Sequence, residues 1–208
     1  MKILVVSATQ MEIEPFLQKN NNCQTLIAGV AIPNTIYHLT KRLLHEKFDI
    51  VIQAGIAGTF TKKIKKGEVV IVEEDVFADI GVEEKGEFKT MFELGFDDKN
   101  KFPFTNSRLI NNSQVIKLSS LKKVKAVTVN KITDKQKQIK YLTQKFSAEI
   151  ESMEGAAFHY VCLQQNIPFL QLRSISNKVG ERDKSKWRIK ESIKNLNNEL
   201  IKLVDSLK

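Results

Sequence analysis

The 208-residue sequence contains few cysteines and no cluster of metal ligands. Its two cysteines, Cys23 and Cys162, lie in apolar surroundings, and no CxxC pair or Cys/His group is present. The sequence therefore offers neither a zinc site nor a disulfide framework. We expect buried, reduced thiols, which favour a cytoplasmic location. We expect no metal ion and no other cofactor.

Long hydrophobic runs are absent as well. No apolar segment approaches the roughly 20 residues that a membrane-spanning helix needs, so we expect no membrane association. We find no repeat, low-complexity segment or linker that would divide the chain, and residues 1–208 are predicted to form one domain. Hydrophobic residues make up 42% of the sequence, which is enough for a large core.

Two common nucleotide-binding fingerprints are missing. The segment Gly55-Ile-Ala-Gly58 is rich in glycine, but it lacks the GxGxxG spacing and no Lys-Ser/Thr pair follows it. Neither a dinucleotide-binding motif nor a Walker loop fits. Two interpretations remain open for this segment. It is a tight turn at the end of a strand, or it is a stretch of backbone that a ligand approaches closely.

The formal net charge is +9, but the basic residues are not concentrated. No basic motif interleaved with aromatic residues occurs, so a nucleic-acid partner is not indicated. A scattered excess of lysine is typical of a solvated surface. Such a charge can still attract an anionic small molecule toward a cleft.

Short apolar segments alternate with amphipathic ones along most of the chain. This alternation predicts an α/β fold, a three-layer α/β/α sandwich with a central mixed, mostly parallel twisted sheet. Residues 77–120 are less regular and are predicted to form walls or a lid over a site. Strands are expected at 2–7, 24–29, 49–54, 68–76, 124–129 and 168–177, and helices at 9–20, 34–47, 134–146, after 154, and from 184 onward.

Polar residues gather where one predicted helix begins and where the next strand ends. Glu151 and Glu154 stand at the start of the helix, and the run Arg173-Ser-Ile-Ser-Asn177 ends the strand. Ligands bind outside the carboxyl ends of the strands in open α/β sheets, so we expect both groups to face one crevice. The alternatives are structural: the acids complement the helix dipole, and Arg173 pairs with a local acid.

Glu12 allows two interpretations that exclude each other only in part. With Thr9 it forms the T-x-x-E pattern of a helix capping box. It also stands just beyond the first strand, where a carboxylate can act as a general base. Trp187 is expected to anchor the final helix to the core.

Together these motifs resemble the purine nucleoside phosphorylase/nucleosidase superfamily. The similarity rests on Glu12, on Gly55-Ile-Ala-Gly58, on Glu154 within Ser-Met-Glu-Gly-Ala-Ala, and on the strand that ends at Asn177. Within the superfamily, the segments 78–83, 151–155 and 176–182 are most similar to futalosine hydrolases. The resemblance implies a homodimeric hydrolase whose partner is a purine nucleoside.

The resemblance also implies roles for individual residues. Glu12 would activate the attacking water, and Met153 would pack beneath a ribose whose hydroxyl groups bind Glu154. Catalysis would fall to Glu12 and Asn177. The residues expected to bind substrate are Ala57, Gly58, Met153, Glu154, Arg173 and Ser176.

Asn177 takes the place of an aspartate that adenosine-type nucleosidases use to protonate the leaving base. An amide cannot act as a general acid, but its NH2 group can donate hydrogen bonds. A 6-oxopurine accepts at N7 and O6, and an unmatched buried acceptor costs about 1–3 kcal/mol. The residue therefore favours hypoxanthine as the leaving base. Together with this base, the resemblance to futalosine hydrolases implies hydrolysis of futalosine to dehypoxanthine futalosine in menaquinone biosynthesis.

Water is favoured over phosphate as the attacking group. Related phosphorylases hold phosphate with arginines near the first strand and after the glycine-rich segment. Here the segment 7–12 has no arginine, and 58–63 has only lysines. Two alternatives stay open: a nucleosidase for methylthioadenosine, S-adenosylhomocysteine or aminodeoxyfutalosine, and a purine-nucleoside binding protein without turnover.

Overall fold

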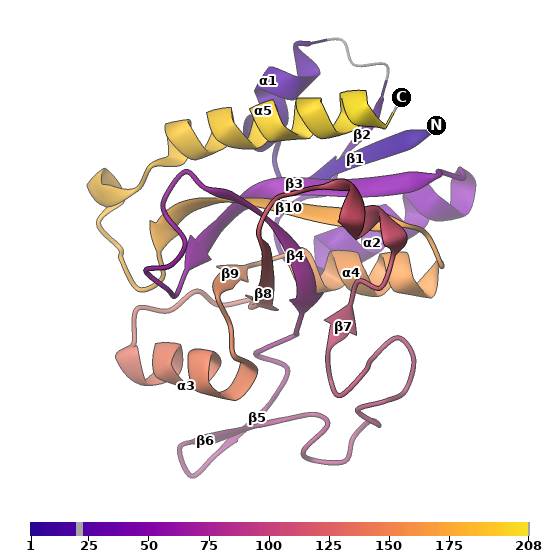
Figure 1. The fold of residues 1–208 in the computed structure, drawn as a ribbon. Coiled ribbons are helices and arrows are strands. Elements are labelled where there is room, and N and C mark those ends of the chain that lie inside the picture. The colour runs from indigo at the N-terminus through magenta and orange to yellow at the C-terminus, as the bar shows by residue number, and fades with distance from the viewer. Residues whose placement is uncertain (20–22, 208) are drawn as a thin grey trace.

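The computed structural model describes residues 1–19 and 23–207, in which helices alternate with strands (Figure 1). The helices are α1 (Gln10–Leu17), α2 (Ile32–His45), α3 (Gln136–Phe146), α4 (Gly155–Gln164) and α5 (Ile189–Ser206), with 3-10 turns η1 (Gln114–Leu118) and η2 (Lys184–Lys186). The strands are β1 (Ile3–Ser7), β2 (Gln24–Ile27), β3 (Ile50–Thr59), β4 (Val69–Asp75), β5 (Gly81–Glu84), β6 (Glu87–Thr90), β7 (Leu109–Ile110), β8 (Lys123–Thr128), β9 (Ile150–Ser152) and β10 (Phe169–Lys178).

The predicted α/β class with a mixed sheet is confirmed. The large sheet runs in the order β10-β4-β8-β9-β3-β1-β2, and most of its neighbours are parallel. Strand β10 also pairs with β3, so β3, β9, β8, β4 and β10 close into a ring. The sequence-based prediction of a three-layer sandwich did not include this closure, which gives part of the sheet the form of a small barrel.

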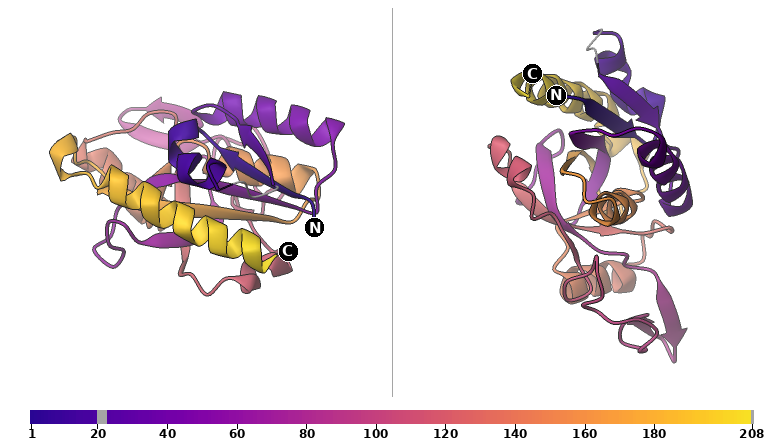
Figure 2. Two further views of the ribbon diagram at one scale, coloured as in Figure 1. Left: turned by 90° about the horizontal axis from the view of Figure 1, so that it is seen from above. Right: turned by 90° about the vertical axis from the view of Figure 1, so that its right-hand side faces the viewer.

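Helices cover both faces of the sheet around β1, β3 and β10, with α1 and α5 on one side and α2 and α4 on the other (Figures 1 and 2). Every residue of β1 is buried because the strand is covered from both sides. Ile3 and Val5 pack into the core beneath α1 and α5, and Leu4 and Val6 pack into the core beneath α2 and α4. This burial accounts for the unbroken apolar run in the sequence.

Helix α1 is short and irregular, and α5 holds it in place. Pro15 lies inside α1, where proline has no N–H to donate, and Ile13 leaves helical geometry. The buried Asn197 of α5 compensates for this irregularity. Its amide donates to the carbonyl of Glu12 (2.8 Å) and accepts from the N–H of Phe16 (3.0 Å). Helix α5 therefore fixes the turn that carries Glu12.

Two predicted boundaries are wrong. Asn34 was expected to cap α2, but the N-cap is Ala31, and Pro33 provides the early proline that helices favour at their start. The strand expected at 49–54 continues as β3 through Gly55-Ile-Ala-Gly58 to Thr59, so the tight-turn interpretation of this segment is wrong. Pairing with β10 along the segment, and with β9 from Gly58 onward, keeps this glycine-rich segment extended.

The first and last helices and the irregular segment 77–120 are present, and the two helices differ from the predictions by a few residues at their ends. Helix α1 ends at Leu17, and its expected end at residue 20 lies outside the described residues. The last helix begins at Ile189, so Trp187 precedes α5 instead of anchoring it from within. Within residues 77–120, β5 and β6 form a hairpin that extends away from the main sheet (Figure 1). Among the described residues, no helix is long and apolar enough to cross a membrane.

Candidate active site

A cavity of about 220 Å3 lies where the ends of β1, β3, β9 and β10 meet the first turns of α1 and α4. Most of the predicted site residues line it. Those that do so are Glu12, Ala57, Gly58, Met153, Glu154, Ser176 and Asn177. The folded chain therefore brings together residues that are up to 165 positions apart in sequence, numbered 12 to 177.

Arg173 is the predicted substrate-binding residue that does not line the cavity. It is only 1% exposed and lies behind Glu154, with its Nη1 3.6 Å from Glu154 Oε2. Its Nη2 donates to Gln53 Oε1 at 2.8 Å. These contacts indicate that Arg173 positions Glu154 and balances its charge, because the cavity does not reach the guanidinium.

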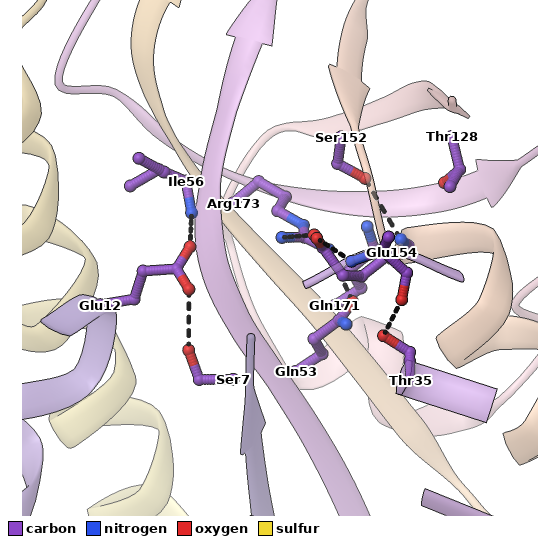
Figure 3. Close-up of polar contacts among 12 residues, drawn as sticks. Ser7, Glu12, Thr35, Gln53, Ile56, Thr128, Ser152, Glu154, Gln171 and Arg173 are labelled. Atoms are coloured by element: carbon purple, nitrogen blue, oxygen red, sulfur yellow. Dashed lines mark hydrogen bonds and ion pairs between the residues drawn. The ribbon is translucent and has the colours of Figure 1, made fainter. Parts of the chain in front are cut away.

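The carboxylate of Glu12 is held by four donors. Oε2 accepts from the hydroxyl of Ser7 (3.2 Å) and from the N–H and hydroxyl of Thr9 (both 3.0 Å). Oε1 accepts from the backbone N–H of Ile56 at 3.0 Å (Figure 3). The capping box is present, and the same carboxylate lines the cavity, so both interpretations of Glu12 are compatible with the structure.

Gly55 is needed because two side chains converge on it. A Cβ atom at this position would lie 2.5 Å from Arg173 Nη1 and 3.0 Å from Glu12 Oε1. Strand β3 passes between the two charged groups, and only glycine leaves them room. Of the two interpretations of the glycine-rich segment, close approach is the one that applies at this position, although the approaching groups belong to the protein.

Glu154 is buried at the N-cap of α4 and is 6% exposed. Its Oε1 accepts from the N–H of Ala31 at 3.1 Å. Ala31 has a φ of 77°, a rarely occupied region for a residue with a side chain, and in this conformation its N–H reaches the site. Burial raises the pKa of the Glu154 carboxyl; Arg173 and the Ala31 N–H oppose this rise, and Glu12 adds to it.

Asn177 follows an irregularity in β10. The register of β10 against β3 shifts between Ile175 and Asn177, so that Asn177 pairs with Gly58. Its Oδ1 accepts from the Ser176 hydroxyl at 2.7 Å, and its Nδ2 donates to the carbonyl of Lys178 at 3.0 Å. These two contacts orient the amide and leave one of its N–H bonds available to a ligand in the cavity.

Two further residues belong to this cavity: Glu151, which was expected to face the crevice but was given no role in substrate binding, and Trp187, which was expected only to anchor the last helix. Glu151 is 5% exposed, and its Oε2 has no hydrogen-bond partner among the described residues. Burial raises the pKa of Glu151 to about 7, the charge of Asp79 adds to the rise, and Arg182 opposes it. Trp187 also lines the cavity, with the Arg182 guanidinium 5.9 Å from its ring centre. Glu151 lines the cavity as expected of the two acids, but no pattern in the sequence indicated that its carboxyl group would lack a partner.

Residues 77–120, which were expected to supply walls or a lid, do not line the cavity. They act on it only at a distance, through the charge of Asp79. Asp79 is itself fixed by the backbone N–H groups of Asn130 and Lys131, at 2.5 and 3.3 Å. The nearby wall is formed instead by Ile132, from the loop after β8.

A second polar layer lies behind α4 and is fully enclosed. Asp75 accepts from the Thr128 hydroxyl at 2.9 Å and from Gln171 Nε2 at 3.4 Å, and burial raises its pKa to about 7. Thr128 accepts in turn from the first-turn N–H of Ala156 at 2.7 Å. A Cβ atom on Gly155 would lie 2.2 Å from Asp75, so glycine at this position allows α4 to begin against the layer.

His159 borders the same layer and has no contact with the cavity. It is completely buried, and its Nδ1 lies 3.1 Å from the carbonyl of Leu109. Burial lowers the pKa of His159 to about 4, so the ring is neutral near pH 7. The structure therefore gives His159 a packing role.

Comparison with known proteins identifies the family. The model of the phosphorylase superfamily matches residues 23–207. The chain belongs to this superfamily. Futalosine hydrolase from Thermus thermophilus is 28% identical over 210 residues, which cover 91% of this chain and 89% of that protein. The 5'-methylthioadenosine/S-adenosylhomocysteine nucleosidase of Shewanella denitrificans is 26% identical over 206 residues, covering 86% of this chain and 87% of that one.

Solved structures show the same fold. The 5'-methylthioadenosine/S-adenosylhomocysteine nucleosidase of Helicobacter pylori with butyl-thio-DADMe-Immucillin-A superimposes with a TM-score of 0.81. The match covers 99% of this superfamily member and 98% of the other chain, at 18% sequence identity. The fold is therefore retained where most side chains differ, and the substrate must be argued from the site.

Proposed function

We propose that this protein is a nucleosidase that hydrolyses the N-glycosidic bond of futalosine and releases hypoxanthine. The observation that carries the proposal is the cavity into which two carboxyl groups and one amide converge, from Glu12, Glu154 and Asn177. The similarity to futalosine hydrolase over most of both chains supports the choice of substrate.

Glu12 is proposed as the general base. As the bond between C1' and the purine nitrogen lengthens, the ribose gains oxocarbenium-ion character. Water attacks C1', and the Glu12 carboxylate takes the proton that the water loses. Its four donors keep the carboxylate in one orientation, so little rearrangement precedes the proton transfer.

Glu154 and Met153 are proposed to bind the ribose. A carboxylate accepts hydrogen bonds from two vicinal hydroxyl groups, and Met153 supplies an apolar surface beneath the ring. The Arg173 guanidinium lies 3.6 Å from Glu154 on the side away from the cavity and favours the charged form of the acid. Arg173 is thus a positioning residue for the sugar.

Asn177 is proposed to bind the leaving base. Its free N–H can donate to N7 or O6 of hypoxanthine and stabilise the negative charge that builds on the departing purine. An aspartate carboxylate at this position would be a second acceptor facing the acceptor O6, and the two would repel each other. The amide, which Ser176 and Lys178 hold in this orientation, therefore favours a 6-oxopurine over adenine.

The charges of the cavity favour water over phosphate. Of its described lining residues, Arg182 alone carries a permanent positive charge, and it lies near Glu151 and Trp187. The lining also includes Glu12, Glu151 and Glu154. Phosphate beside Glu12 would meet a carboxylate, and Arg173, across β3 from Glu12, does not line the cavity, which disfavours phosphate binding.

We further propose that the protein is a cytoplasmic homodimer. Helix α2 exposes two large apolar side chains, Tyr37 at 60% and Leu44 at 69%, and the cavity residue Val30 just before α2 is 45% exposed. Large exposed apolar groups mark interaction surfaces when they occur together. Light scattering coupled to size-exclusion chromatography tests the dimer directly; a monomeric mass at micromolar concentration would contradict it.

The substrate is tested by incubating the protein with futalosine, inosine or methylthioadenosine, with and without phosphate, and measuring the free base by chromatography. We expect hypoxanthine from futalosine at a rate that phosphate does not change. Release that requires phosphate would overturn hydrolysis. Adenine from methylthioadenosine, with no action on futalosine, would favour the alternative nucleosidase. Binding without release from any of the three would favour a non-catalytic binding protein.

A further inference from the structure

Glu151 has a carboxyl group that the fold buries but does not satisfy. It is 5% exposed, it lines the cavity, and no described residue donates a hydrogen bond to its Oε2. No ion pair joins it to a described residue, and Arg182 acts on it only through its charge. A buried polar group without a partner is costly, and at a cavity wall a ligand can supply the missing partner.

The strand register places Glu151 opposite Asn177. Gly58 of β3 pairs with Asn177 of β10 on one side and with Glu151 of β9 on the other. Neighbouring strands are about 4.8 Å apart, so roughly 10 Å separates the backbones of the two outer residues. All three residues line the cavity, and the middle one has no side chain. The gap between the amide and the carboxyl group can therefore take a flat ring that is bound at its edge from both sides.

We propose that Glu151 binds the N1–H edge of the leaving 6-oxopurine and is a specificity-determining residue for the base. The proposal rests on the proposed function. Going around the ring of hypoxanthine, N7 and O6 accept hydrogen bonds and N1–H donates one. The free N–H of Asn177 donates to N7 or O6, and Glu151 accepts from N1–H. In adenine the N1 position is an acceptor, and an ionised carboxylate there would face a lone pair.

The surroundings of Glu151 suit this role in either protonation state. Burial and Asp79 raise its pKa to about 7. The ionised carboxylate accepts from N1–H, and the protonated acid accepts from N1–H while its O–H donates to O6. Both forms therefore bind the N1–H and O6 side of the ring, and the ionised form is the one that rejects adenine. Trp187 in the same wall provides an aromatic face against which the base can pack.

The first experiment compares kcat/KM for futalosine in the wild type, Glu151→Ala, Glu151→Gln and Glu149→Gln. Removing the acceptor should lower kcat/KM about 10- to 100-fold. The glutamine variant keeps an oxygen that accepts from N1–H and should stay within about fivefold of wild type. Glu149 is the matched control, since its carboxylate bonds to the backbone of Lys125 and does not line the cavity.

A second measurement separates recognition of N1–H from a merely structural role. Trp187 is the only tryptophan of the chain and lines the cavity, so its fluorescence reports base binding. Wild-type protein should bind hypoxanthine at least about tenfold more tightly than 1-methylhypoxanthine, which lacks the N1–H. In Glu151→Ala this preference should fall to about threefold or less, because the acceptor is gone and the methyl group gains room.

The outcomes distinguish this inference from the proposed function. If wild-type protein hydrolyses futalosine but Glu151→Ala does so equally well, or keeps the full preference against 1-methylhypoxanthine, the role of Glu151 is overturned and the function stands. If wild-type protein releases no hypoxanthine from futalosine, the function fails, and the assignment of Glu151 to a 6-oxopurine fails with it.

Discussion

The two ends of the cavity are built differently. At the sugar end, the carboxylate of Glu12 has four protein donors, and Glu154 has the Ala31 N–H and the Arg173 guanidinium. At the base end, Glu151 has an oxygen with no partner, and Asn177 keeps an unused N–H. The groups proposed for chemistry are fixed before substrate arrives, whereas the groups proposed for recognition are completed by it.

This difference follows from what each end has to do. A general base contributes most when its position does not change during the reaction. Protein donors can therefore occupy its hydrogen-bonding positions with little loss of substrate specificity. A recognition group discriminates only if the wrong ligand leaves it unpaired. Substitutions at each end can test whether the sugar end is the rigid part and the base end the selective part.

The largest expected effect is at Glu12. Glu12→Gln keeps the size of the side chain but removes the base, so kcat should fall about 10³-fold while hypoxanthine binding changes little. Steady-state kinetics and Trp187 fluorescence titration measure the two quantities. Turnover within tenfold of wild type would return Glu12 to a capping role alone.

The next effect concerns the space that Glu12 and Arg173 share. In Gly55→Ala the new methyl group would meet Arg173 Nη1 at 2.5 Å, and neither buried partner can move freely. We expect kcat/KM to fall about 100-fold and the free energy of unfolding to fall by about 1–3 kcal/mol. Combined with Glu12→Gln the losses should be less than additive, because both changes act on one arrangement. Fully additive losses in kcat/KM would show that Gly55 does not act through Glu12.

A stability test probes the enclosed layer behind the sugar end. Burial raises the pKa of Asp75 to about 7, so between its ordinary unfolded value and pH 7 the folded protein binds the extra proton. The contribution of Asp75 to stability is therefore full at low pH and is lost as pH rises through 7. From pH 5 to pH 8 this loss should reach about 2–3 kcal/mol. In Asp75→Asn it should be absent.

Urea unfolding at pH 5 and pH 8 measures this difference. The pH dependence must be compared between variants, because His159 makes the stability change with pH in the opposite direction. Burial lowers the pKa of His159 to about 4, so its contribution is lost as pH falls below its ordinary value. The exposed Asp134→Asn serves as control and should follow the wild type. Parallel pH profiles for Asp75→Asn and wild type would contradict the raised pKa.

The smallest effect in free energy is expected at Asn177. Asn177→Asp should weaken kcat/KM for futalosine about tenfold, because a carboxylate facing O6 replaces a donor. Release of adenine from methylthioadenosine should rise relative to release of hypoxanthine. If the ratio of the two substrates does not change, the amide is not a determinant of the base, and the contrast between the two ends loses one of its supports.

Much of the sugar end was predictable from the sequence because its residues occur in local patterns. Glu12 was marked by its spacing from Thr9, and Glu154 by the small residues that follow it in α4. Their convergence was predictable from the rule that strand ends form the site. The role of Arg173 behind Glu154 was not, because burial of a charge depends on which distant acid it meets.

The base end was harder to predict because it depends on pairing between distant strands. Glu151 faces Asn177 only because β9 and β10 both pair with Gly58, and no local pattern encodes that register. The same pairing explains why Gly55-Ile-Ala-Gly58 is extended and not a turn. The closure of five strands into a ring could not be predicted either, because the alternation of strands and helices does not determine which strands become neighbours.

The closed ring of strands has a consequence for how the substrate preference of the protein can be changed. Strand β3 carries Gly55 at the sugar end and Gly58 at the base end, and it is paired with β10 along this whole stretch and with β9 from Gly58 onward. A change in the side chains at one end therefore has little means of displacing the other. Substitutions at Glu151 and Glu12 should contribute independently to the free energy of catalysis. The preference for a base can then be altered by substitution without rebuilding the groups that break the bond.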